Sequence, residues 1–149
     1  VEFYAFGGSA PVAMDGQHKF FRLKISSSYI SDPHLQFMSA NSLGKDDVVV
    51  AISQSGTTAA LIESIKIVRK NGAKVIGIMP GDTPLANICD FPLTINVGSN
   101  NRISKPVTSR IAYTAVIDVL TMGVAQLKPE AQDHLYNIAD SQRSLKVDN

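Results

Sequence analysis

The stretch Val48-Val49-Val50-Ala51-Ile52-Ser53-Gln54-Ser55-Gly56-Thr57-Thr58 decides the fold of this chain. Its first five residues are apolar, which is typical of a strand buried on both faces of a parallel sheet. The composition then changes to hydroxyl side chains around a single glycine. The next twelve residues, 59–70, carry apolar side chains at helical spacing. The sequence therefore predicts a strand, a polar turn and a helix.

The Ser53–Thr58 loop has the chemistry of an anion site. A turn from strand to helix brings free backbone N–H groups and the positive end of a helix dipole to one point. Ser53, Ser55, Thr57 and Thr58 add hydroxyl donors. A turn that only caps its helix needs one such residue, so this composition favours a bound anion such as a phosphate. The loop contains no lysine, which argues against a Walker-type nucleotide loop.

Length and composition indicate one globular domain. The chain has 149 residues, 44% of them hydrophobic, and a net charge of +1, so nothing global points to nucleic acid or to a membrane surface. No uninterrupted apolar run is long enough to span a bilayer. The single cysteine, Cys89, excludes an internal disulfide and fits a cytoplasmic protein. The chain starts inside a strand-like segment, residues 1–6, so we expect it to be part of a longer protein.

Strands alternate with helices along the chain, which predicts a parallel sheet with right-handed crossovers. We expect a three-layer αβα sandwich with a five-stranded parallel sheet of flavodoxin-like topology. If the first and third strands are neighbours, the turn around Ser9 lies beside the Ser53–Thr58 loop, and the two form one site. The expected strands are residues 1–6, 24–29, 48–52, 74–79 and 91–97, and the expected main helices are 10–23, 33–41, 59–70, 109–127 and 130–144.

Two helices carry further expectations. Val12, Met14, Gln17, His18 and Phe21 gather on one side of the first helix, where His18 is a packing or interface residue rather than a metal ligand. The helix expected over 109–127 is apolar on nearly every side, so the sheet covers one face and a second subunit could cover another. This pattern predicts a homodimer. Asp118, alone among apolar residues, is expected to pair with a cation or cap a backbone group.

The segment 98–110 is basic and precedes that long helix. It contains Arg102, Lys105 and Arg110, and no acid occurs between Asp90 and Asp118. Its charge is compatible with an ordinary solvated loop. Its place just past a strand end, beside the expected anion site, favours a role in binding.

The motifs resemble those of a known family. Gly8-Ser9 after the first strand and Ser53–Thr58 after the third resemble sugar isomerase (SIS) domains, which bind phosphosugars. Ser109-Arg110-Ile111-Ala112, at the start of the long helix, is similar to the RpiR family of bacterial transcription regulators. In that family a helix-turn-helix domain precedes an SIS domain. The resemblance therefore implies an SIS domain over residues 1–149 that reaches DNA only through a domain outside this chain.

The resemblance also implies the ligand-binding residues. Ser9, Ser53, Ser55 and Thr58 would hold a phosphate, with Gln54 near the sugar chain and Gly56 and Thr57 completing the loop. For the hexose-catabolism regulators of the family, the implied effector is 2-keto-3-deoxy-6-phosphogluconate. Its carboxylate gives a use for Lys105 and Arg110, beside Ser109, although the sequence leaves open which cation contacts it.

Isomerase chemistry is disfavoured by one departure from the family. Isomerase SIS domains carry a catalytic glutamate before the last helix, where this chain has Ser104. Proton transfer between C1 and C2 of a sugar needs a base within hydrogen-bond reach. We therefore expect a sensor that is not an enzyme and has no cofactor or metal. The alternatives are a phosphosugar isomerase or lyase using Glu63 or Asp82, and a flavodoxin-like nucleotide-binding module.

Overall fold

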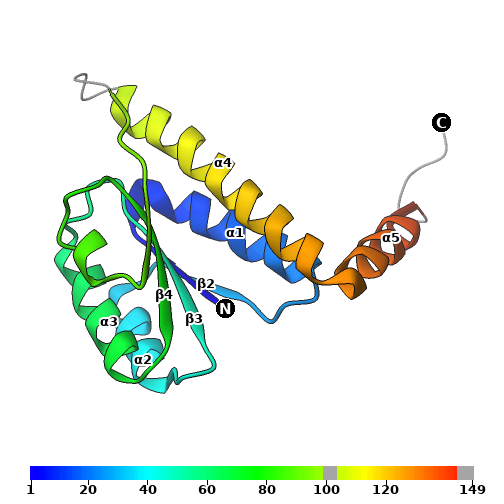
Figure 1. The fold of residues 1–149 in the computed structure, drawn as a ribbon, viewed down its shortest axis with the longest axis horizontal. Coiled ribbons are helices and arrows are strands. Elements are labelled where there is room, and N and C mark those ends of the chain that lie inside the picture. The colour runs from blue at the N-terminus through cyan, green and yellow to red at the C-terminus, as the bar shows by residue number, and fades with distance from the viewer. Residues whose placement is uncertain (99–103, 144–149) are drawn as a thin grey trace.

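The protein is a five-stranded parallel sheet between two layers of helices (Figure 1). The computed structural model describes residues 1–98 and 104–143. The strand order is β2-β1-β3-β4-β5, and every neighbouring pair is parallel. This confirms the predicted αβα sandwich and makes the first and third strands neighbours. The strands are β1 (Glu2–Ala5), β2 (Ser28–Ile30), β3 (Val48–Ile52), β4 (Lys74–Met79) and β5 (Phe91–Thr94).

The helices cover both faces of this sheet. Figure 1 shows α1 and α4 on one face, α2 and α3 on the other, and α5 extending beyond the sheet. Two short 3₁₀ turns, η1 (Gly7–Ser9) and η2 (Ala86–Ile88), follow β1 and β4. The helices are α1 (Ala10–Arg22), α2 (Pro33–Ser42), α3 (Ala59–Lys70), α4 (Ser104–Leu127) and α5 (Pro129–Arg143).

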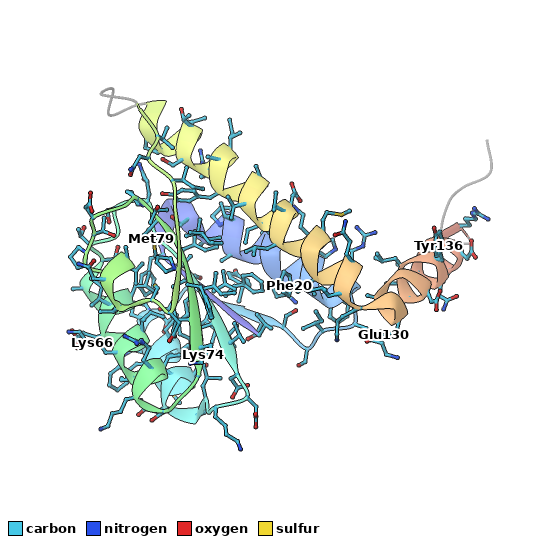
Figure 2. All side chains as sticks on the ribbon, in the orientation of Figure 1. Phe20, Lys66, Lys74, Met79, Glu130 and Tyr136 are labelled. Atoms are coloured by element: carbon cyan, nitrogen blue, oxygen red, sulfur yellow. The ribbon has the colours of Figure 1, made fainter. Side chains whose placement is uncertain are left out.

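The central strand β3 is buried on both faces, as its run of apolar residues predicts. Alternate side chains along a strand point to opposite faces. Val49 belongs to the core under α3, together with Ile65, whereas Val50 belongs to the core under α1 and α4. In that second core, Phe3 and Phe20 meet edge to face with ring centroids 5.3 Å apart, and Figure 2 labels Phe20 between α1 and the sheet.

The side of α1 on which the sequence gathers Val12, Met14, Gln17, His18 and Phe21 is for the most part not the side that packs on the core. Only Val12 of that group is buried, while Met14 and Phe21 are exposed to 50% and 62%. The helix packs instead through Val12, Ala13, Gly16 and Phe20. Gly16 decides this face because a β-carbon there would lie within 3 Å of the Phe3 ring. The small residues of α1, not its bulky ones, therefore mark where the sheet approaches.

The edges of the sheet are shorter than predicted. β2 begins at Ser28 instead of residue 24, because the chain first passes through a left-handed residue, Lys24, with φ of 59°. β5 ends at Thr94 instead of residue 97. The boundaries of β3, α3 and β4 agree with the prediction residue for residue.

α4 begins at Ser104, five residues before the start that we predicted. The segment from Ser104 to Arg110 is therefore helix, and its reading as part of a basic loop is wrong. Pro106 does not prevent this, because a proline is tolerated in the first turn, where backbone N–H groups have no helical partner. Arg102 lies outside the described residues. The side chain of Lys105 also lies outside them.

α4 is apolar but poorly covered. Over Pro106–Leu127 it is long and apolar enough, by length and composition alone, to cross a membrane. The sequence pattern did not suggest this. In an 18-residue window of this segment, 17% of the residues are buried. Core helices of folded domains pass the same test. Its inner side chains Tyr113 and Ile117 are buried against the sheet. Its outer side is apolar and exposed.

The exposed apolar side chains of α1 and α4 lie on two helices that run side by side (Figure 1). We call five of them the outer stripe: Met14, Phe21, Ile111, Val119 and Met122. Val107 and Leu127, near the two ends of α4, are also exposed. Asp118 lies within it and forms an ion pair with Lys19 of α1, which also pairs with Asp15 at 2.6 Å. The expectation that Asp118 pairs with a cation is therefore confirmed.

Candidate functional site

The candidate site lies at the carboxyl ends of β1 and β3. A sheet of order 2-1-3-4-5 changes direction between these two strands, so the loops that follow them diverge and leave a crevice. A cavity of about 150 Å³ occupies this position, and we call it the first cavity. It is lined by Phe6, Gly8, Ser9, Ile52, Ser53, Gln54, Ser55, Thr58 and Leu61.

Hydrogen bonds inside the Ser53–Thr58 loop prepare its hydroxyl groups as donors. The Gly56 N–H donates to Ser53 Oγ at 3.1 Å, and the Thr57 N–H donates to Ser55 Oγ at 3.2 Å. A serine hydroxyl has one proton and can accept as well as donate. Because each oxygen accepts from the backbone, each proton can be given to an acceptor outside the loop. An anion is the acceptor that gains most from such donors.

Two helices begin at the first cavity without a side-chain cap. Neither Thr58, the N-cap of α3, nor Ser9, the N-cap of α1, makes a side-chain cap hydrogen bond. The first turn of α3 therefore keeps N–H groups that a ligand can use, together with the positive end of the helix dipole. In α1 the first amide, the Ala10 N–H, donates to the Gly7 carbonyl of η1, and Pro11 has no N–H, so this side of the cavity offers the Ser9 hydroxyl instead. Ser9 is 7% exposed and reaches this position because Gly7 turns the chain with a φ of 51°.

A second cavity, of about 180 Å³, adjoins the first. Gly8, Ser9 and Gln54 line both cavities. The opposite wall of the second cavity is the start of α4, which contributes Pro106, Ser109, Arg110 and Tyr113. Arg110 is exposed, and no ion pair joins it to an acid within residues 1–98 and 104–143. A ligand can therefore lie with one end at the loop and the other beside a guanidinium group.

The structure brings together most of the residues that the sequence proposed. Ser9, Ser53, Gln54, Ser55 and Thr58 line the first cavity, and Ser109 and Arg110 line the second. Gly56 and Thr57 line neither cavity and serve the loop through their backbone instead. Lys105 belongs to the first turn of α4, but its side chain is not among those described.

Several lining residues were missed by the sequence reasoning. Phe6, Ile52 and Leu61 are apolar residues that flank the loops, and their pattern is that of any core residue. Tyr113 lies one helical turn after Ser109, so helical periodicity from the RpiR-like motif could have found it. Pro106 could not be placed because the helix was expected to start after it.

Among the described residues that line the two cavities, none is a carboxylate or a histidine. Glu63, one candidate base, is directed to solvent and pairs with Lys66 at 2.6 Å. Asp82, the other, is an exposed turn residue that lines neither cavity. Burial raises the pKa of Tyr113 to about 12, so its hydroxyl stays protonated at neutral pH. The site as described offers hydrogen-bond donors and positive charge but no general base.

Metal binding is the other chemistry to consider for this region. Across the described parts of the chain, no group of three His, Cys, Asp or Glu side chains is arranged to hold a metal ion. Cys89 carries a free thiol, and its burial, aided by the charge of Asp90, raises its pKa to about 11. The hydrogen-bond donors that line the first cavity are therefore the feature that a function has to explain.

Comparison with known proteins agrees with this arrangement. The family model described as "SIS domain" matches residues 1–123. The chain is 38% identical over 142 residues to the HTH-type transcriptional regulator HexR of Pseudomonas aeruginosa, covering 95% of this chain and 50% of that protein. It is also 38% identical over 125 residues to the bifunctional protein glk of Burkholderia thailandensis, covering 84% of this chain and 20% of that protein.

Among solved structures, the Vibrio vulnificus NanR protein complexed with ManNAc-6P superposes with a TM-score of 0.88 at 21% identity. The match covers 99% of this chain and 56% of that one. At this identity the likeness shows the fold alone. The chain thus spans about half the length of the HexR protein that it matches. The family match extends from β1 into α4 and includes both loops of the crevice, and this chain belongs to the SIS domain family.

Proposed function

We propose that this chain is the effector-sensing domain of an RpiR-type transcriptional regulator and that it binds a phosphorylated sugar acid. The observation that carries this proposal is the pair of adjoining cavities. One has prepared hydroxyl donors and the uncapped N-terminus of α3, and the other has Arg110. A small molecule with a negative charge at each end matches both.

In this proposal the phosphate lies against the Ser53–Thr58 loop. Ser53 and Ser55 donate their hydroxyl protons, and the first turn of α3 adds backbone donors. Ser9 donates from the other side of the crevice. The carboxylate end lies in the second cavity, where Arg110 is placed to bind it and Lys105 supplies positive charge nearby in sequence. Gln54, which lines both cavities, lies beside the carbon chain.

We propose 2-keto-3-deoxy-6-phosphogluconate as the effector. The similarity to HexR, a transcriptional regulator, supports the sensing role. That NanR is a solved structure with a sugar phosphate bound supports the ligand class for this fold. The absence of an acid among the described lining residues supports binding without turnover, because an aldose–ketose isomerase needs a base at the sugar.

The regulator that we propose is dimeric, is located in the cytoplasm and binds DNA through a domain outside this chain. The outer stripe supports the dimer, because it leaves apolar residues exposed on two neighbouring helices, and exposed apolar patches often mark interfaces. A two-fold protein matches the two half-sites of a typical operator. Effector binding can then control DNA binding only if it favours one arrangement of the dimer over another.

Calorimetric titration of this chain tests the proposal. We expect binding of 2-keto-3-deoxy-6-phosphogluconate and of 6-phosphogluconate, with weaker binding of glucose 6-phosphate, which lacks the carboxylate. The same protein incubated with glucose 6-phosphate should form no fructose 6-phosphate. Conversion would establish the isomerase alternative, and failure to bind any of these phosphates would refute the sensing function.

A further inference from the structure

A turn behind the Ser53–Thr58 loop holds that loop in place. Gly56 is buried and has a left-handed backbone with φ of 64°. A β-carbon added to it would lie 2.5 Å from Cβ and 2.7 Å from Cγ2 of Thr83, so the glycine backbone sits directly against the threonine side chain. Beside this contact, the Leu85 N–H donates to the Gly56 carbonyl at 3.1 Å. The loop is thus fixed from behind by the segment between β4 and η2.

The Thr83 hydroxyl is committed to that segment. It donates to the Pro80 carbonyl at 3.1 Å and accepts from the Ala86 N–H at 3.3 Å. Thr83 is 8% exposed and lines neither cavity. Its only proton is used, so it is not a donor to a ligand. Any effect of Thr83 on binding is therefore indirect, and its direct contact with the loop is at Gly56.

We infer that Thr83 is a positioning residue for the anion-binding loop. Its two hydrogen bonds fix its side chain, its side chain fixes the backbone at Gly56, and the Gly56 N–H in turn orients the Ser53 hydroxyl. The inference rests on the proposed function, since it assigns Thr83 to the same phosphate site. It extends that site to a residue of the β4–η2 turn, 27 positions beyond Gly56 in the sequence.

The variants that test it separate shape from hydrogen bonding. Thr83→Val keeps the shape but removes both hydrogen bonds, whereas Thr83→Ser keeps the hydroxyl and removes one methyl group. Ile65→Val is the matched control, because Ile65 is a fully buried core residue of α3, the helix that follows the loop, and lines neither cavity. If Thr83→Val does not fold, Thr83→Ala, which lacks the same hydroxyl and leaves more space, takes its place.

The affinity for 6-phosphogluconate is measured by calorimetry at a temperature where all variants are folded. We expect Thr83→Val to bind about tenfold more weakly, because a small displacement of a preorganised loop misaligns several donors at once. Thr83→Ser and Ile65→Val should stay within about twofold of the parent chain. Unchanged affinity in Thr83→Val, or an equal loss in Ile65→Val, would overturn the inference while leaving the proposed function intact.

A second measurement needs no ligand. Hydrogen exchange of the Gly56 and Thr57 amides is followed by NMR in the free protein, since both amides donate inside the loop. We expect exchange about tenfold faster in Thr83→Val but not in Ile65→Val, because only the former frees the loop. If the parent chain binds none of the phosphates, the proposed function fails. In that case equal exchange in the two variants would also overturn the role of Thr83 in holding the loop.

Discussion

The two walls of the candidate site are held in place by different means. The Ser53–Thr58 loop is fixed by bonds within one subunit: two hydroxyl–amide bonds inside the loop and the Gly56–Leu85 bond behind it. The opposite wall is the first turns of α4, whose outer side is exposed and apolar. The first wall needs nothing outside the domain. The second wall belongs to a helix that one sheet face covers only in part.

This difference teaches where rigidity and response can reside in the same pocket. A loop that is preorganised contributes affinity at little entropic cost when the ligand arrives. A helix whose outer side meets another subunit can transmit a change in its position to that subunit. We therefore expect substitutions in the loop to change affinity but not assembly, and substitutions in α4 to change affinity and assembly together.

The largest effect is expected from adding a single methyl group to the Ser53–Thr58 loop at Gly56. Gly56→Ala combines a left-handed backbone, which costs a non-glycine residue about 1–2 kcal/mol, with overlap on Thr83, which costs about 1–3 kcal/mol. We expect the free energy of unfolding to fall by about 3 kcal/mol and phosphate binding to be lost. Urea unfolding and calorimetry measure the two. Gly44→Ala is the control, because a β-carbon at Gly44 would lie in open space, and it should change neither value.

The next effect concerns the outer side of the helix wall. Val119→Asp places a charge on the outer stripe, where Val119 is 72% exposed in the single chain. If this stripe is the dimer interface, two like charges meet across it at a cost of several kcal/mol, about 3 kcal/mol at least. Sedimentation at tens of micromolar should then show a monomer. Met38→Asp, on an equally exposed methionine of α2, is the control and should leave the dimer intact.

A second substitution in the loop removes one hydrogen-bond donor and leaves the fold intact. Ser55 is exposed, and its oxygen accepts from the Thr57 N–H within the loop. Ser55→Ala removes a hydrogen bond to a charged phosphate, which is worth about 1.5–3 kcal/mol. Affinity should fall accordingly while the melting temperature stays the same. Ser42→Ala, a serine of α2 that bonds only to the carbonyl of Met38, is the matched control.

How much of this could be predicted depended on whether a feature is local. The bounds of β3 and α3 followed from an apolar run, a hydroxyl loop and a segment of helical spacing, which are all adjacent in sequence. The packed side of α1 did not, because it is chosen by the Phe3 ring lying against Gly16, a contact between two elements. The start of α4 was placed too late because a basic, proline-containing segment resembles a loop until its helical hydrogen bonds are seen.

The same distinction applies to the candidate site. The hydroxyl residues of the first cavity were identified because they follow one strand as a block. The contact between Thr83 and the loop was not predicted, because no sequence pattern near residue 83 indicates a contact with Gly56. Only the parallel pairing of β3 with β4 brings the ends of these strands, and so the two turns, together.

A smaller effect distinguishes the two walls by ligand. Arg110→Gln combined with Lys105→Gln should weaken 6-phosphogluconate about tenfold more than glucose 6-phosphate, a difference of about 1.4 kcal/mol. The reason is that only the first ligand carries a carboxylate for the helix wall. Parallel titrations measure both affinities. Equal losses would mean that these cations serve the phosphate, and no loss would remove Arg110 from the site.

The smallest effect concerns the ion pair that joins the helix wall to α1. Burial by itself lowers the pKa of Lys19, but its bonds to Asp118 and Asp15 outweigh burial, and the net pKa lies above the usual value. A raised lysine pKa stabilises the fold below the unfolded pKa of about 10.4, and this contribution is lost as pH rises through the higher folded value. Asp118 is 56% exposed, so Asp118→Asn should cost less than about 1 kcal/mol at neutral pH.

Buried Tyr113 also destabilises the fold at alkaline pH, but equally in both proteins, because its raised pKa of about 12 means that only the unfolded chain ionises near pH 10. The difference in unfolding free energy between the parent chain and Asp118→Asn should therefore be constant from pH 7 to about 10 and shrink above it. A difference that persists unchanged at pH 11.5, measured by urea unfolding, would mean that Asp118 acts through packing and not through the charge of Lys19.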